Sequence, residues 1–200
     1  IGIGYYALKT NIDGDHCIAI GSQALEDFEA SSDGDGQNIA IGHQASKEAT
    51  TPVRNTFIGY QANAGGVTTG SYNTGIGYQV GYDLTSGHQN TFLGNKAGQN
   101  ITEGARNTIV GKDAGATVVT GNNNLLVGTP TTGEYNIAIG FEAGKVLQGA
   151  AHKNCIIGGQ SAIALQTGAD NCTLGYRALH SANNDESGNV AIGYYALEEM

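Results

Sequence analysis

The stretch Asn136-Ile137-Ala138-Ile139-Gly140-Phe141-Glu142-Ala143-Gly144 is one copy of a unit that recurs throughout this sequence. The unit reads Asn, a variable residue, a mostly small or apolar residue, an aliphatic residue, Gly, two variable residues and usually Ala. Most successive copies lie 17 or 18 residues apart, and such a period over a whole chain is typical of repeat architectures. Twelve copies align on the repeat glycines, which are Gly4, Gly21, Gly42, Gly59, Gly77, Gly94, Gly111, Gly128, Gly140, Gly158, Gly175 and Gly193.

The composition narrows the class of protein. Gly occupies 32 of 200 positions, Trp is absent, and charged residues make up 14% of the chain. So few charges are untypical of a disordered chain, and the glycines lack the every-third-residue spacing of collagen. The net charge of −9 argues against binding of nucleic-acid phosphates, and no apolar run is long enough to cross a membrane. We therefore expect no nucleic-acid partner and no membrane insertion in this segment.

A short strand is predicted before each repeat glycine. The residue directly before the glycine is Ile, Leu or Val in all twelve copies, and the residue two positions earlier is Ile, Val, Leu, Thr or Cys. These two positions share one face of an extended strand, because side chains alternate with period 2. The residue between them is also uncharged. The pattern therefore predicts a strand that is buried on both faces.

An asparagine lies four residues before the repeat glycine in ten of the eleven complete copies, and Cys17 is the exception. Identical amides stacked at the strand spacing of about 4.8 Å can hydrogen-bond along a column, which satisfies a polar group at a buried corner. Glycine often precedes this asparagine by three residues, and alanine often follows the repeat glycine by three. The predicted ladder consists of Asn38, Asn55, Asn73, Asn90, Asn107, Asn124, Asn136, Asn154, Asn171 and Asn189.

These features predict an all-β fold, a parallel β-solenoid of about twelve rungs in which each unit is a coil with two short strands and two turns. Residues 1–200 form a single repeat domain, which we interpret as a segment of a longer fibre protein. The two irregular spacings place their length changes in an outer turn, at residues 26–37 and 129–132. Because so thin a coil buries little surface, we expect lateral association with identical chains through the Ala column and the mixed Ala/Phe/Gly column. The alternative is a monomeric solenoid.

The repeats of residues 55–63 and 73–81 show the pattern that carries a resemblance to known families. Asn-Thr-x-Ile-Gly-Tyr-Gln resembles the repeats of bacteriophage tail-fibre proteins. It is also similar to the Asn-Ser-x-Ala-Ile-Gly head repeats of trimeric autotransporter adhesins. The resemblance covers the whole chain and implies a left-handed β-roll, a homotrimer, and an extracellular location on a virion tail or cell surface. The period near 17 and the lack of coiled-coil heptads depart from the adhesin pattern.

No constellation in the sequence indicates catalysis, so we expect no enzymatic activity and no cofactor. Asp13-Gly-Asp15 and Asp33-Gly-Asp35-Gly36 resemble calcium loops, but the complete calcium motifs are absent. Solvated turn carboxylates are the favoured interpretation, and a cation shared between chains is the alternative. No metal site is predicted. The five histidines are scattered over unrelated repeat positions.

Cys155 and Cys172 occupy the same position in adjacent repeats, whereas Cys17 stands in the asparagine column. The spacing of the first two suits no metal motif. They are expected to stack within Cα reach of a disulfide, and the favoured interpretation is that they are small core residues.

Tyrosine recurs directly after the repeat glycine, followed in several copies by glutamine. Aromatic rings beside amides are common at sugar-binding surfaces, so this ladder is a candidate ligand-binding site. Stacking along the rod or against a neighbouring chain is the favoured alternative. The candidate binding residues are Tyr60, Tyr78, Tyr176 and Tyr194.

Three hypotheses of function follow. The first is a fibre segment, either shaft or receptor-binding region, of a phage tail fibre, with a host glycan or protein receptor as partner. The second is the head of a bacterial trimeric surface adhesin. The third is a purely structural extracellular filament whose partners are copies of itself.

Overall fold

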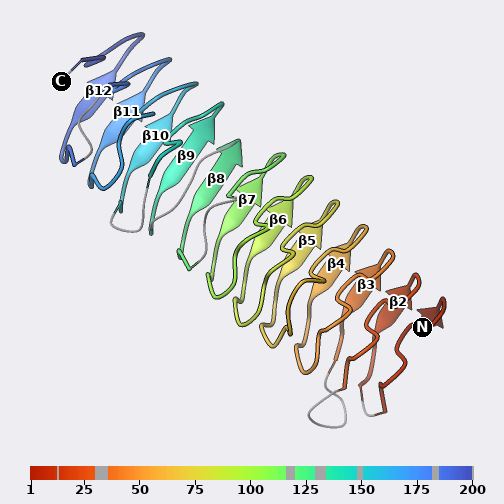
Figure 1. Cartoon of the computed structure of the whole chain (residues 1–200). Coiled ribbons are helices and arrows are strands. Elements are labelled where there is room, and N and C mark those ends of the chain that lie inside the picture. Colours follow the sequence, from red (N-terminus) through yellow and green to blue (C-terminus); the bar gives the residue numbers. More distant parts are fainter. Residues whose placement is uncertain are drawn as a thin grey trace.

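The computed structural model describes residues 1–12, 14–29, 36–115, 120–128, 134–147, 151–181 and 185–199. Over these residues the chain is all-β, and no helix occurs among them. Twelve parallel strands form one sheet in chain order, and the chain coils into a β-solenoid of about ten turns. The predicted parallel β-solenoid is therefore confirmed. The strands lie side by side in a single row, with the first and last strands at opposite ends (Figure 1).

Each strand ends at or just before a repeat glycine, and most strands are three residues long. The strands are β1 (Gly2–Ile3), β2 (Ile18–Ile20), β3 (Ile39–Ile41), β4 (Thr56–Ile58), β5 (Thr74–Ile76), β6 (Thr91–Leu93), β7 (Thr108–Val110), β8 (Leu125–Gly128), β9 (Ile137–Gly140), β10 (Cys155–Ile157), β11 (Cys172–Leu174) and β12 (Val190–Ile192).

The register of the sheet places equivalent repeat positions directly beside one another. In β5 and β6, for example, Thr74 pairs with Thr91 and Ile76 pairs with Leu93. The same register holds between β8 and β9, although their repeat glycines are only 12 residues apart. The prediction that equivalent repeat positions stack on one another is therefore confirmed. The two length changes fall largely on residues 30–35 and 129–133, which lie outside the described residues.

The prediction of two strands per unit is wrong for the described part of the chain. Each unit has one strand, and the rest of the coil contributes only isolated bridges, such as Ala49 with Thr68 and Glu134 with His152. The physical reason is the backbone after the repeat glycine. The residue two positions after the repeat glycine has a positive φ in successive units, for example 50° at Gln61 and 47° at Gln79. Residues in this left-handed region turn the chain and interrupt an extended strand.

The prediction of strands buried on both faces is also wrong. Only the middle residue of each strand from β2 to β12 is buried, and the residues on either side of it are partly or fully exposed. The mixed Ala/Phe/Gly column therefore faces the interior, and the aliphatic column faces outward. The Ala column is likewise interior, since Ala62, Ala97 and Ala114 are fully buried. Neither column expected to contact a neighbouring chain is available for that contact.

Complementary sizes along the interior explain this orientation. Phe57 and Phe92 are buried in β4 and β6, and Gly75 lies between them in β5. A Cβ on Gly75 would stand 2.6 Å from the Phe57 ring, so the ring occupies the space that the glycine leaves. The mixed column alternates large and small side chains because the narrow interior must be filled without voids.

The repeat glycines allow one turn of the coil to approach the next. Their φ values lie between 116° and 148°, a region that side chains rarely adopt. A Cβ on Gly94, for instance, would lie 2.6 Å from the carbonyl oxygen of Gly111. The glycines before the ladder asparagines differ, because Gly87 and Gly104 have no positive φ. They are needed for close approach alone: an added Cβ would lie 2.5 Å from the Gly104 oxygen at Gly87 and 2.6 Å from the Gly121 oxygen at Gly104.

We predict that Gly94→Ala destabilises the solenoid by about 2–4 kcal/mol, through positive-φ strain and the clash with Gly111. Gly188→Ala is the control, because a Cβ there meets nothing within 4 Å, and we expect a loss of about 1 kcal/mol from its positive φ alone. The measurement is the midpoint of urea unfolding followed by circular dichroism. Equal losses in the two variants would contradict the close-approach argument.

Candidate functional site

A continuous ladder of asparagines lines one corner of the solenoid. The side-chain oxygen of each asparagine accepts a hydrogen bond from the backbone N–H of the next one, at 2.7 to 3.1 Å, from Asn38 through to Asn189. Nine of the ten are buried, and Asn189 is half-buried. Because each amide satisfies a backbone donor in the next turn, the column joins consecutive turns through side chains as well as through the sheet.

The amide nitrogen of the ladder side chains is satisfied as well. Asn90 Nδ2 donates to the Asn73 oxygen at 3.0 Å and to the Gly104 carbonyl at 2.8 Å. Asn107 makes the equivalent pair of bonds to Asn90 and Gly121. The residue three positions before a ladder asparagine thus presents its carbonyl to the amide of the previous turn, and this residue is often a glycine, as with Gly104 and Gly121. A buried polar column is tolerated because its donors and acceptors are paired.

The candidate tyrosines form two separate stacked pairs. The rings of Tyr60 and Tyr78 lie 5.5 Å apart and nearly parallel, at 5°, and those of Tyr176 and Tyr194 lie 5.7 Å apart at 19°. The two pairs lie beside β4–β5 and β11–β12, so the intervening strands separate them (Figure 1). His43 extends the first pair, with its ring 5.3 Å from that of Tyr60. The structure therefore brings the four tyrosines together two by two and not as one surface.

The glutamines beside the first pair are occupied by one another. Gln44 donates to Gln23 at 2.9 Å, Gln61 to Gln44 at 2.8 Å, and Gln79 to Gln61 at 2.9 Å. Beside the second pair, the Tyr176 hydroxyl donates to Gln160 Oε1 at 3.1 Å. Since the inner ring faces and several amides already have partners, packing along the rod accounts for these residues. The ring edges remain exposed for a ligand, with Tyr60 47% and Tyr78 43% exposed.

A charged cluster beside Tyr194 was not found by sequence reasoning. Arg177 Nη1 donates to the Tyr195 hydroxyl at 3.1 Å, and Arg177 Nη2 lies 3.5 Å from Glu198 Oε1. The hydrogen bond from Arg177 lowers the pKa of Tyr195, whereas the hydrogen bond with Tyr195 raises the pKa of Tyr194. Repeat periodicity carries no signal for this cluster, because tyrosine and arginine alternate with glutamine and lysine at the same repeat position in other units.

The outer face of the sheet is an apolar surface that runs along all twelve strands. It consists of the two outward columns of the strands and contains no charged side chain. Ile3, Val190 and Ile192 in the first and last strands are 59 to 67% exposed, and Ile76, Leu93 and Leu174 are 42 to 48% exposed. We call this surface the outer sheet face; the column before the glycines is Ile3, Ile20, Ile41, Ile58, Ile76, Leu93, Val110, Val127, Ile139, Ile157, Leu174 and Ile192, and the second is Ile18, Ile39, Thr56, Thr74, Thr91, Thr108, Leu125, Ile137, Cys155, Cys172 and Val190.

Cys155 and Cys172 lie on this outer sheet face and not in the core, which corrects the favoured interpretation of them as core residues. They are Cα partners in neighbouring strands, and both are free thiols. Cys155 is half-buried and Cys172 is exposed. Burial is the main cause that raises the pKa of the Cys155 thiol, and the neighbouring Cys172 adds to it. The alternation of side chains in β10 and β11 turns both thiols outward, because the buried middle positions are Ile156 and Thr173.

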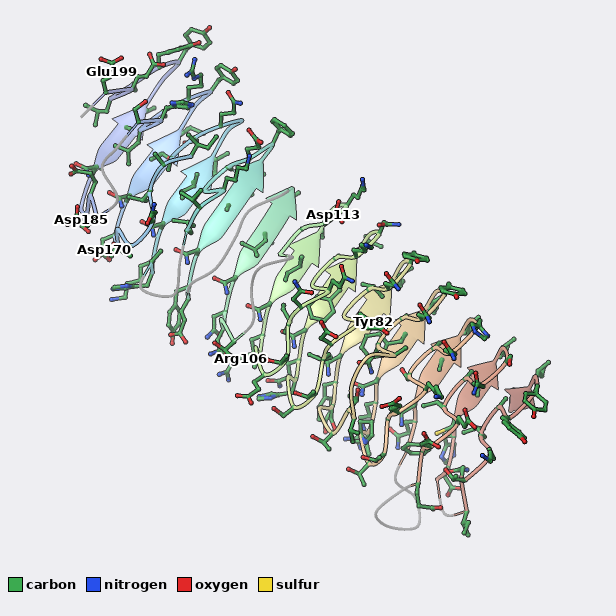
Figure 2. All side chains as sticks on the ribbon, in the orientation of Figure 1. Tyr82, Arg106, Asp113, Asp170, Asp185 and Glu199 are labelled. Carbon is green, nitrogen blue, oxygen red and sulfur yellow. The ribbon has the colours of Figure 1, made fainter. Side chains whose placement is uncertain are left out.

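The remaining candidates yield no site. Asp13, Asp33 and Asp35 lie outside the described residues, and Asp15 forms an isolated bridge with Gly36. Among the residues that the structure covers, no group of three His, Cys, Asp or Glu side chains is placed to hold a metal ion. The side chains of the described residues are drawn in Figure 2, where Asp113 lies well away along the rod from Asp170, Asp185 and Glu199.

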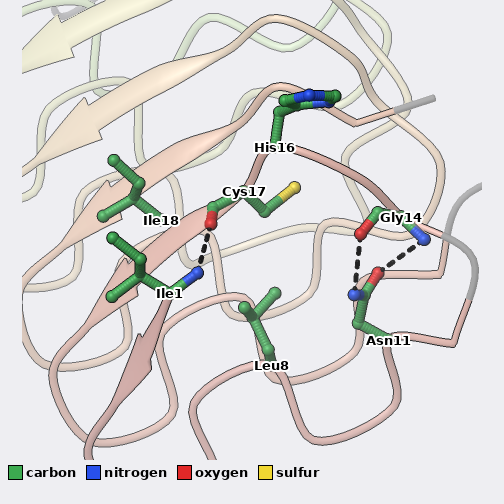
Figure 3. Close-up of a pocket in the computed structure, with 7 residues that line it drawn as sticks. All are labelled: Ile1, Leu8, Asn11, Gly14, His16, Cys17 and Ile18. Carbon is green, nitrogen blue, oxygen red and sulfur yellow. Dashed lines mark hydrogen bonds between the residues drawn. The ribbon is translucent and has the colours of Figure 1, made fainter. Parts of the chain in front are cut away.

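A cavity of about 380 Å³ opens at the β1 end of the solenoid (Figure 3). Two of its polar groups are turned to partners within the chain: the Asn11 amide binds both backbone groups of Gly14 at 3.0 Å, and the Ile1 nitrogen donates to the Cys17 carbonyl at 2.7 Å. His16 also lines the cavity. Leu8 and Ile18 supply apolar walls. No set of free polar groups converges in this cavity to orient a ligand.

Comparison of the chain with protein-family models, with curated proteins and with solved structures finds no match. The resemblance to phage and adhesin repeats therefore remains a prediction from the sequence. Within the described ranges there is also no helix that is long and apolar enough to span a bilayer.

We predict that Asn90→Ala destabilises the chain by about 2–4 kcal/mol, because it orphans the buried N–H of Asn107 and the Gly104 carbonyl. Asn95→Ala, at an exposed position, is the matched control and should change stability by less than about 0.5 kcal/mol. Chemical unfolding of both variants measures the difference. The ladder would lose its assigned role if both variants unfolded at the same midpoint as the parent chain.

Proposed function

We propose that this chain is a non-enzymatic fibre segment that assembles with identical copies and serves as shaft or receptor-binding region of a phage tail fibre. The observation that carries the proposal is the outer sheet face. It is uncharged along all twelve strands and carries an unbroken aliphatic column before the repeat glycines, while the interior is already filled by the alanine and mixed columns. In the proposed assembly the rods are left-handed, lie on the exterior of a virion tail and form a homotrimer.

The size of the outer sheet face supports association. Twelve strands at a spacing of about 4.8 Å give a strip roughly 50 Å long, and two outward columns make it about 10 Å wide. Its area is on the order of 500 Å² before the relief of the side chains is counted. That is as large as the largest apolar patch of a typical monomer, and two such strips together reach the roughly 1,000 Å² in total that a specific interface needs. A surface of this kind favours a protein partner over water.

The distribution of threonine along the outer sheet face favours a parallel, in-register assembly of identical chains. Thr56, Thr74, Thr91 and Thr108 occupy four consecutive strands, with aliphatic residues and cysteines at the same position elsewhere. In register, the four hydroxyls face hydroxyls of the neighbouring copy and can pair with them. In a full-length antiparallel arrangement Thr56 would face Ile137 and Thr74 would face Leu125, so these two hydroxyls would stay unpaired, at a cost of about 1–3 kcal/mol each.

The two tyrosine pairs are the candidate contacts with a receptor, either a cell-surface glycan or a protein. Tyr60 and Tyr78 present exposed ring edges, and the stacked pair of Tyr176 and Tyr194 lies beside the hydrogen bond from Arg177 to Tyr195. Aromatic faces with adjacent polar groups suit sugar rings. The charge of −9 gives no support for a nucleic-acid partner.

Two alternatives share the same architecture. A bacterial trimeric adhesin head would use the same outer sheet face for assembly and differ only in the surface that carries it. A purely structural filament would use the outer sheet face alone and leave the tyrosine pairs without a ligand. The second alternative is favoured by the partners that the Tyr and Gln side chains already have along the rod.

We predict that the double variant Ile76→Asp/Leu93→Asp converts the assembly to monomers, because two charges would be buried in an apolar contact. Val67→Asp is the control, since Val67 is 54% exposed but lies away from the outer sheet face. Light scattering coupled to size-exclusion chromatography measures the mass, with three chains expected for the parent and the control. A parent chain that is monomeric at micromolar concentration would contradict the proposal.

For receptor recognition, we predict that the variant Tyr60→Ser/Tyr78→Ser loses binding to host cells or glycan arrays by tenfold or more, about 1.4 kcal/mol. Tyr72→Ser is the control, because Tyr72 is exposed but lies outside the stacked pairs. Unchanged assembly with unchanged binding would assign this segment to a shaft. Loss of binding with intact mass would assign it to the receptor-binding region.

A further inference from the structure

Cys155 and Cys172 form a pair of thiols that neither the fold nor the proposed function uses. Each is the first residue of its strand, and the register pairs them directly. The next strands on either side place Ile137 and Val190 at the same position. Two free thiols therefore stand side by side on the outer sheet face, between aliphatic neighbours.

The spacing of the two strands disfavours a disulfide. Neighbouring strands lie about 4.8 Å apart, and side chains at paired positions of parallel strands point the same way, so their Cβ atoms keep about that separation. A disulfide needs Cβ atoms roughly 3.5–4.5 Å apart. A bond between the two sulfurs would thus require the strands to move. The hydrogen bond from the Asn171 N–H to Asn154 Oδ1, directly before the two cysteines, opposes this movement.

The same spacing suits a metal ion held between the two sulfurs. A metal–thiolate bond is about 2.3 Å long, so a linear sulfur–metal–sulfur unit spans about 4.6 Å. Within the described residues no third His, Cys, Asp or Glu is grouped with the pair, which disfavours the four-ligand sites that divalent zinc requires. A soft cation that accepts two thiolates is the species that fits, and thiolates select copper(I) among such ions.

We propose that Cys155 and Cys172 together bind one copper(I) ion as a two-coordinate thiolate site. On binding, each thiol releases its proton to solvent and each sulfur donates an electron pair to the metal, so that the site gains a net charge of −1. Copper enters and stays in the +1 state, and no electron is transferred. The inference rests on the strand register and on the outward direction of both thiols, and it does not need the proposed fibre function. In the proposed assembly the two thiols would lie on the contact face, so the test below includes a variant in which that face is open.

The test is an anaerobic titration of the fully reduced chain with copper(I), in competition with a chromogenic copper(I) chelator. We expect one ion per chain. The variants Cys155→Ser and Cys172→Ser should each bind copper(I) about 100-fold more weakly, because the gain from a second ligand held nearby is lost. Cys17→Ser is the matched control and should bind as the parent does, since Cys17 is buried at the other end of the rod.

Several outcomes would overturn the proposal. One is that neither the parent chain nor the variant Ile76→Asp/Leu93→Asp binds copper(I). The variant is included because its outer sheet face stays uncovered even if assembly covers that face in the parent. Another is equal affinity of the two single variants and the parent, which would show that no chelate forms. A third is rapid, quantitative formation of an intrachain disulfide in air, detected by mass spectrometry, because it would show that the sulfurs approach more closely than the register implies.

Discussion

The structure depends on the stacking of each turn directly over the previous one at the spacing of β-strands. With this register, each residue must be compatible with the equivalent residue of the next turn, which lies only a few ångströms away. The buried asparagines meet this condition because each side chain satisfies the backbone N–H of the next turn, from Asn38 to Asn189. The repeat glycines meet it because no Cβ obstructs the neighbouring carbonyl. One geometric constraint therefore explains both of the most regular columns in the sequence.

The same constraint separates the surfaces of the rod by chemical type. The interior accepts alanine and a mixed column in which Phe57 and Phe92 flank Gly75, and it has no room for a second aliphatic column. The aliphatic residues therefore remain outside, where they form a continuous uncharged strip. In a single chain such a strip is costly to leave in water, which is the physical basis for proposing assembly. Columns of tyrosine and glutamine form a separate edge, whose rings and amides interact mainly with their own neighbours.

Sequence reasoning was most reliable for features that follow directly from the period. The strand positions, their parallel order and their register all agree with the alignment on the repeat glycines. Sequence reasoning was least reliable for which face of each strand points into the coil. Alternation with period 2 shows that Ile39 and Ile41 share a face and that Ala40 occupies the opposite one, but it does not say which of the two is inside. The second strand per unit was predicted from the two glycine bends in each unit, whereas left-handed residues such as Gln61 make the rest of the coil a series of turns.

By itself, the sequence determined that the chain is a parallel β-solenoid, where its strands lie, and that asparagine follows asparagine along one corner. These features follow from the repeat period, and the repeat period can be read from the sequence alone. Only the tertiary structure decided which columns are inside, because that depends on the width of the closed coil and on how Phe, Ala and Gly fill it. It also decided that Cys155 and Cys172 face outward and that the tyrosines form two pairs, since both depend on the direction in which each side chain leaves the backbone.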